Sequence, residues 1–352
     1  MPANVIPASA IAPLQVRALG PVGPFPAASM RRVLERRWLH YAFLSRDGEL
    51  GLVANVAWLG ARADDDHAGP RSTSILLLHE RERGWAASQF NATTPGPPWS
   101  AFSRPGGDGR FAVAATDGSV GVDLVVRRTS RPCTSQCAPF AHGQHLRWQS
   151  ETGVTAHGRW TLDGRARDGV DAVGYHERVR GYWGWPELGG WVFGFANDPG
   201  RSASGRPATA VVFTLIHPGD PPDAATASVM LWRDGRLARH FPRRRVSAAV
   251  RGELDENRIV QVPALANVLG VPPMATIPRR LVIAGRMGAD EVLLDFACDS
   301  AARVVIPSET SLDPFSVHEV IGAVGVEGRL AGRSFAFETR GIVEFAGGAG
   351  GD

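Results

Sequence analysis

The segment "GVTAHGRWTLDGRARDGVDAVGYHERVRG" (residues 153–181) carries the pattern that decides the fold. Two strand-like runs flank Leu-Asp-Gly-Arg-Ala, and an Asp-Gly pair between such runs is a preferred sequence of the type I′ β-hairpin. The same pair recurs in "RDGEL", "TDGSV" and "RDGRL". Repeated hairpins without crossover helices predict antiparallel sheets, as in sandwiches or barrels. We therefore expect an all-β protein.

The rest of the chain follows the same pattern. Runs of four to eight β-branched and apolar residues end at Gly, Asp, Asn or Pro, while helical periodicity is scarce. We expect only a few short helices, near residues 30–36 and 262–270. A segment rich in Gly, Pro and Ser, residues 197–210, separates two arrays of strands. The pattern predicts two domains, over residues 25–200 and 206–346.

Composition excludes several classes of protein. The 352 residues are 44% hydrophobic and 21% charged, which is typical of globular proteins. The net charge of +3 rests on arginine alone, because the chain has no lysine, and this excludes a Schiff-base mechanism. The basic residues are scattered, so we expect no nucleic-acid partner. The three cysteines cannot form a disulfide framework, and we find neither a signal-peptide pattern nor a transmembrane run. The expected location is cytoplasmic, without stable membrane insertion.

The candidate site lies in "AVGYHERVRGYWGWPELGGWVFGF" (residues 172–195). On a strand, His176 and Arg178 share one face while Tyr175 and Glu177 share the other. Ionisable groups on both faces are hard to bury unless one face lines a cavity. This pattern fits the wall of a pocket, but it also fits an aromatic core in which the histidine and glutamate pair with an arginine. Periodicity does not say which face meets a ligand.

Three segments resemble a known family. Gly174, Tyr175, Glu177 and Gly181, followed by a Trp-x-Phe-Gly element at residues 191–194, are similar to the central motif of the carotenoid 1,2-hydratases (hydroxyneurosporene synthases) and the AttH-like lipocalin superfamily. The aromatic segment "RRWLHYAFLSRDGELGLVANV" resembles the N-terminal strand and hairpin of that superfamily. The C-terminal pattern also agrees, with its anchors at Gly328, Gly332, Gly341 and Glu344. Arg178 departs from the pattern, because family members often carry an acid or histidine there.

The resemblance implies two lipocalin-like antiparallel β-domains packed together around a hydrophobic cavity. It also implies hydratase, cyclase or Diels–Alder-type chemistry on a hydrophobic polyene, without an organic cofactor. A carboxylic acid in an apolar pocket stays protonated and can protonate an alkene, so Glu177 with His176 fits that scheme. A pericyclic reaction instead needs a donor that polarises a carbonyl, for which Tyr175, His176 or Arg178 would serve. A lipocalin-like carrier without catalysis is the alternative.

Aromatic and amide side chains are the candidate lining of the pocket. We expect the substrate to contact Trp183, Trp185, Trp191, Trp99, Gln89, Asn91, Trp58 and Tyr41. The substrate is expected to be a hydrophobic small molecule, and the protein a monomer or a homodimer.

One further cluster has residues that suit a metal. Cys133, Cys137, His142 and His145 lie within thirteen residues. Their tight spacing includes a proline and a glycine, so the segment could bind zinc, form a disulfide on oxidation or be an inert loop. We favour the inert loop and expect no metal there. For Glu344, near the last strand, we expect burial against an arginine.

Overall fold

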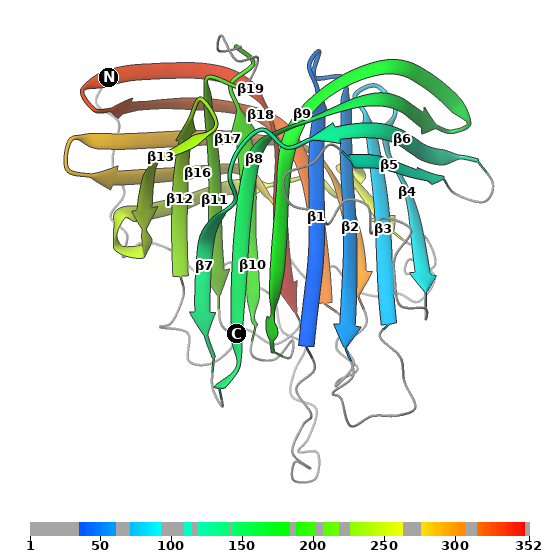
Figure 1. Ribbon diagram of the computed structural model, residues 1–352, viewed down its shortest axis with the longest axis horizontal. Helices are drawn as coiled ribbons and strands as arrows, with labels where there is room; N and C mark the ends of the chain where they lie inside the picture. Colours follow the sequence, from blue (N-terminus) through cyan, green and yellow to red (C-terminus); the bar gives the residue numbers. More distant parts are fainter. Residues whose placement is uncertain are drawn as a thin grey trace.

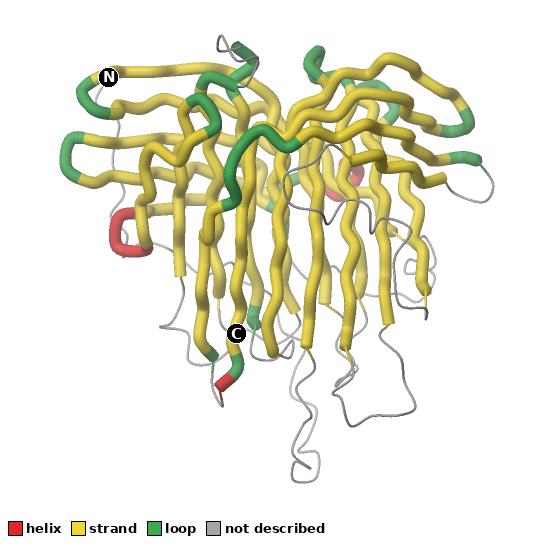
Figure 2. Tube along the Cα trace, in the orientation of Figure 1, coloured by secondary structure: helices red, strands yellow, loops and turns green. Residues whose placement is uncertain are grey.

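The computed structural model describes residues 35–60, 71–92, 109–114, 118–140, 143–183, 188–200, 207–217, 226–262, 276–306 and 315–348. Nearly all of these residues lie in β-strands, and the only helical segments among them are short 3₁₀ turns (Figure 2). The predicted all-β class is therefore confirmed. The helix predicted near residues 30–36 has its start outside the described residues, and its last two residues lie in a strand. The helix predicted near residues 262–270 falls almost entirely outside them.

The first sheet contains nine strands in the order β4-β3-β2-β1-β9-β8-β6-β5, with β7 paired to β8. Every neighbouring pair is antiparallel. The strands are β1 (Glu35–Ser45), β2 (Leu50–Gly60), β3 (Arg71–Glu80), β4 (Gly84–Ala92), β5 (Gly109–Ala114), β6 (Val120–Arg127), β7 (Cys133–Pro139), β8 (His145–Leu162) and β9 (Arg165–Tyr182).

The second sheet contains ten strands in the order β13-β12-β11-β10-β19-β18-β17-β16-β14, and β15 pairs with β17 in parallel. The strands are β10 (Gly190–Asn197), β11 (Thr209–His217), β12 (Thr226–Arg233), β13 (Arg236–Pro242), β14 (Val246–Glu253), β15 (Ile259–Val262), β16 (Pro278–Met287), β17 (Asp290–Ile306), β18 (Phe315–Leu330) and β19 (Arg333–Gly348). The 3₁₀ turns η5 (Arg243–Arg245) and η6 (Glu256–Arg258) lie between strands of this sheet.

Two of the four predicted Asp-Gly turns are type I′ turns; at the β1–β2 turn only Gly48 has a positive φ, and Asp117 lies outside the described residues. At the β8–β9 turn, Asp163 and Gly164 have φ values of 48° and 72°, and Asp234 and Gly235 have 51° and 75° at the β12–β13 turn. Two consecutive positive φ angles define the type I′ turn, whose twist matches that of the flanking strands. The long β8–β9 and β18–β19 hairpins bend away from each other at one end of the molecule (Figure 1).

An apolar core joins the two sheets. It includes Trp38 of β1 and Trp148 of β8 from the first sheet, together with Trp191 and Phe193 of β10 and Phe315 of β18 from the second. Each sheet also has its own apolar cluster. The chain passes from the first sheet to the second between β9 and β10, ahead of the predicted linker at residues 197–210. The domain ranges 25–200 and 206–346 stay a prediction.

Candidate active site at the contact between the sheets

The register of β1 against β9 places the predicted site residues. Glu177 lies opposite His40, and Tyr175 lies opposite Ala42. Tyr175 packs in the core that joins the two sheets, as does Trp38 on the same face. The face that carries Tyr175 and Glu177 is therefore the one that meets the second sheet.

Glu177 is 1% exposed and sits in a cage of hydrogen-bond donors. The indole Nε1–H of Trp38 donates to its Oε1 at 2.8 Å, and that of Trp148 donates to its Oε2 at 2.7 Å. The Tyr175 hydroxyl donates to the same Oε2 at 2.9 Å. Both carboxyl oxygens thus have partners, and the cage fixes the orientation of the group.

A chain of hydroxyl groups leads away from this carboxyl. The Tyr175 hydroxyl lies 2.7 Å from Ser150 Oγ, and either atom can be the donor. Ser150 Oγ in turn lies within hydrogen-bond distance of Ser135 Oγ, at 3.1 Å. Because all three side chains are buried, Tyr175, Ser150 and Ser135 form a continuous polar path along the inner face of the first sheet, from β9 across β8 to β7.

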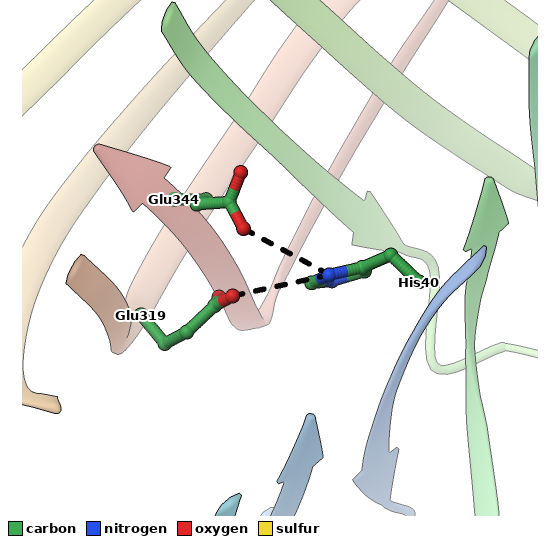
Figure 3. Close-up of side chains that lie close together, drawn as sticks. All are labelled: His40, Glu319 and Glu344. Atoms are coloured by element: carbon green, nitrogen blue, oxygen red, sulfur yellow. Dashed lines mark ion pairs between the residues drawn. The ribbon is translucent and has the colours of Figure 1, made fainter. Parts of the chain in front are cut away.

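The second sheet brings two more glutamates to the same contact. Glu319 of β18 and Glu344 of β19 are cross-strand neighbours, and both side chains are buried. The Trp191 indole donates to Glu344 Oε1. His40 Nδ1 of the first sheet lies 3.8 Å from Glu344 Oε2 and 3.9 Å from Glu319 Oε1, and Figure 3 shows its ring pointing toward both carboxyl groups. Among the described residues the expectation that an arginine would lie against Glu344 is not met; Trp191 donates to this carboxyl group, and the His40 ring lies nearby without a hydrogen bond to it.

Burial dominates the electrostatics of this cluster. It raises the pKa of the Glu177 carboxyl well above its ordinary value, and the nearby Glu344 raises it further, while the three donors oppose the rise. Burial and Glu344 likewise raise the pKa of Glu319. Burial lowers the pKa of His40, since the charged imidazolium would be desolvated. These shifts favour the protonated form of Glu177 and the neutral form of His40.

Indole and phenyl rings surround the acid. Trp38 stacks on Trp191 with ring centroids 5.6 Å apart, and the edges of Trp148 and Trp183 meet Trp38 at 5.8 and 5.5 Å. Tyr175 packs on Phe193 with ring centroids 4.6 Å apart. The faces of such rings attract positive charge, so the cluster can stabilise a cation formed beside it.

The other predicted catalytic residues lie on the opposite face of β9. His176 stacks on Tyr41 with ring centroids 4.0 Å apart, and Arg178 Nε donates to its Nε2 at 3.2 Å. The other ring nitrogen, Nδ1, then carries the proton and donates to the backbone oxygen of His40 at 3.0 Å. Burial lowers the pKa of His176 well below its ordinary value. His176, Arg178 and Tyr41 are thus separated from Glu177 by the sheet itself.

The remaining predicted lining residues divide into three groups. Trp183 and Trp191 lie in the aromatic cluster around Trp38. The backbones of Trp58, Gln89 and Asn91 lie in β2 and β4, outside this cluster. Trp99 and Trp185 lie outside the described residues.

Sequence reasoning missed Trp38, His40, Trp148 and Glu319 as site residues. A signal was present for two of them, because Trp38 and His40 alternate with Leu39 in "RRWLHYAF" and so share a face of that strand. Their meeting with Glu177 depends on the pairing of β1 with β9, which local patterns do not specify.

The cysteine segment does not form a metal site among the described residues. Cys133 packs against the core, whereas Cys137 on the same strand is exposed, because a bulge between Thr134 and Gln136 shifts the alternation. Both thiols are free. His142 lies outside the described residues. The two cysteines therefore lie on different faces and cannot share a cation.

Two surface pockets lie away from Glu177. One, of about 900 Å³, is lined by β14 and β16–β19 and by the arginines of η5. The other, of about 220 Å³, is lined by His79, Glu80 and Trp160 of the first sheet. Within the described part of the chain, no helix has the length and apolar character that crossing a bilayer requires.

No protein-family model matches this sequence, and no curated protein matches it at a significant level. Solved structures do match the fold. NE1406 of Nitrosomonas europaea, which is assigned to AttH, is 17% identical with a TM-score of 0.54, over 94% of this chain and 99% of that one.

Two further structures are similar. Kievitone hydratase of Nectria haematococca is 11% identical with a TM-score of 0.53, over 89% of this chain and 88% of its own. CghA, bound to Sch210972, is 12% identical with a TM-score of 0.52, over 91% and 90%. The chain thus shares the all-β fold of these structures, as the resemblance in the sequence predicts.

Proposed function

We propose that this protein is an enzyme that protonates a carbon–carbon double bond of a hydrophobic polyene, with Glu177 as the acid and without an organic cofactor. The observation that carries the proposal is the cage at the contact between the sheets. It holds a fully buried carboxyl group among indole rings, with Trp38, Trp148 and Tyr175 as its hydrogen-bond donors. The similarity of the fold to a hydratase supports the same class of reaction.

The reaction follows from the arrangement. Glu177 transfers its proton to one alkene carbon, leaving a carboxylate and a carbocation. The three donors of the cage then stabilise the new carboxylate, and the indole faces of Trp38 and Trp191 stabilise the cation. Addition of water gives an oxonium ion, whereas closure of a ring by a second double bond moves the positive charge to a new carbon. Loss of one proton from either ion to the Glu177 carboxylate gives the neutral product and returns Glu177 to its acid form, so the cycle balances.

Glu177→Gln tests this assignment. The amide has nearly the same shape but cannot supply the proton, so we expect turnover to fall by about 10²- to 10⁴-fold. Glu80→Gln is the matched control, since Glu80 is also a buried glutamate of the first sheet but pairs with Arg83 and Arg167. A panel of linear isoprenoid and polyketide polyenes would be incubated with each protein, and the products analysed by mass spectrometry.

The same assay in D₂O separates the alternatives. Protonation by Glu177 places one solvent deuterium on carbon, whereas a pericyclic reaction, with Tyr175 polarising a carbonyl, places none. A non-catalytic carrier would bind members of the panel and return all of them unchanged. Full turnover by the Glu177→Gln protein would show that Glu177 is not the proton donor.

A further inference from the structure

His40 is an unusual histidine for an interior position. Its side chain is 0% exposed, yet neither ring nitrogen has a hydrogen-bond partner. A buried polar group without a partner costs free energy, so native structures rarely leave both imidazole nitrogens unsatisfied. The ring points from β1 of the first sheet toward Glu319 and Glu344 of the second (Figure 3).

The separations exclude a direct hydrogen bond. At 3.8 and 3.9 Å, His40 Nδ1 is too far from the carboxyl oxygens to donate to them. One ligand atom from each of the three residues nevertheless lies within 4.8 Å of the other two. Ligand atoms around a tetrahedral zinc ion are about 3.4 Å apart, because each lies roughly 2.0–2.2 Å from the metal. A contraction of a few tenths of an ångström would bring the histidine distances into this range.

Each of the two carboxyl groups has an oxygen atom that is available to a ligand. Trp191 holds Oε1 of Glu344, which leaves Oε2 directed at His40. Oε2 of Glu319 is buried and has no partner. Donors that hold the non-coordinating atom of a ligand are the usual support of metal sites.

Charge balance also favours a cation. Two carboxyl groups from adjacent strands are buried side by side, and the third group that faces them is an imidazole. A divalent ion would compensate both carboxylates while His40 stays neutral, as a metal-binding histidine must.

We propose that His40, Glu319 and Glu344 bind a divalent first-row transition metal ion, with Zn²⁺ the expected occupant, where the two sheets meet. One imidazole and two carboxylates are ligands that Zn²⁺ accepts, and three protein ligands leave a fourth position open. This site is distinct from the proposed acid, because both oxygens of Glu177 are already hydrogen-bonded within the first sheet.

The full-length protein, without a histidine tag, tests the proposal. After treatment with a chelator and dialysis against Zn²⁺, we expect about one tightly bound ion per chain by mass spectrometry of the elements. Because the ligands come from both sheets, zinc should also raise the melting temperature. X-ray diffraction at the zinc absorption edge should show one anomalous peak between His40, Glu319 and Glu344.

Variants separate a site from loss of folding. His40→Phe keeps a ring in place and should abolish tight binding, while Trp191→Phe should weaken it by about 10- to 100-fold. The controls Cys133→Ser with Cys137→Ser, and Glu177→Gln, should retain the full stoichiometry. The anomalous diffraction experiment uses the wild-type protein, so its result holds even if a variant fails to fold. A zinc-loaded protein with no bound ion, or a peak elsewhere, would show that the two glutamates are neutralised by a proton alone and overturn the proposal.

Discussion

Two glutamates on adjacent strands show how differently one sheet can hold a buried acid. Glu151 and Glu177 are each 1% exposed. Glu151 forms an ion pair with Arg128 on one face, whereas Glu177 on the other forms no ion pair within the described part of the chain. Its partners are neutral N–H and O–H groups. Burial raises the pKa of Glu151 as well, but the hydrogen bond and the positive charge of Arg128 oppose that rise, whereas only neutral donors oppose it at Glu177.

His79 predicts a pH dependence of stability. Burial against Trp85, with Arg340 nearby and Asp299 opposing, lowers its pKa from 6.5 to about 4. Between those values the unfolded chain binds a proton that the folded protein does not, so stability falls as the pH drops from 6.5 toward 4. The loss is about 3.5 kcal/mol at most, at roughly 1.4 kcal/mol per pKa unit.

Urea unfolding of the wild type and of His79→Gln at pH 7 and pH 4.5 measures this contribution. Glu177 and Glu319, whose pKa values are raised, act in the opposite direction, so only the difference between the two proteins reports on His79. That difference should shrink on acidification. A difference that stays constant would mean that His79 titrates normally in the folded state.

At the scale of the strands, local sequence preferences predict the turns and the two faces of each strand, but not which strands pair. The Asp-Gly turns, and the opposite faces of Tyr175 and His176, follow from turn preferences and from the two-residue repeat of a strand. The pairing of β1 with β9 does not, because many strands of similar pattern could compete for that position. For this reason Trp38 and His40 could not be placed beside Glu177 in advance.

At Gly174 the backbones of β9 and β1 approach each other closely. A Cβ at this position would collide with the backbone carbonyl of Ala42 on the neighbouring strand. Gly174→Ala should therefore lower the free energy of unfolding by about 1–3 kcal/mol, because the backbones must separate. Gly325→Ala in β18 is the control, since its Cβ would have no atom within 4 Å. Urea unfolding of both should show a loss for Gly174 alone; equal effects would contradict the close approach.

At the scale of the whole molecule, the two sheets share one core. The apolar cluster containing Trp38, Trp148, Trp191, Phe193 and Phe315 draws on both sheets, so each sheet alone would expose a large aromatic surface. The motifs in the sequence predict two domains of one superfamily, but they do not say that the candidate site belongs equally to both.

Separate expression of the two sheets tests this dependence. A chain ending at residue 188 should aggregate when produced alone, because its half of the aromatic core has no cover. Co-produced with residues 189–352, it should migrate as one complex in size-exclusion chromatography. A monodisperse, folded N-terminal piece would show that the shared core is not needed for the first sheet to fold.

The contact of His40 with Glu344 also has a consequence for how the protein is made. About 300 residues separate the two, and at roughly 5–20 residues per second the ribosome needs about 15–60 s to synthesise them. During that interval the strands of the first sheet emerge without the partner that covers Trp38 and Trp148. Until the C-terminal strands are made, this aromatic face of the first sheet must not bind another apolar surface. The face that forms the site is therefore exposed to misassembly during synthesis.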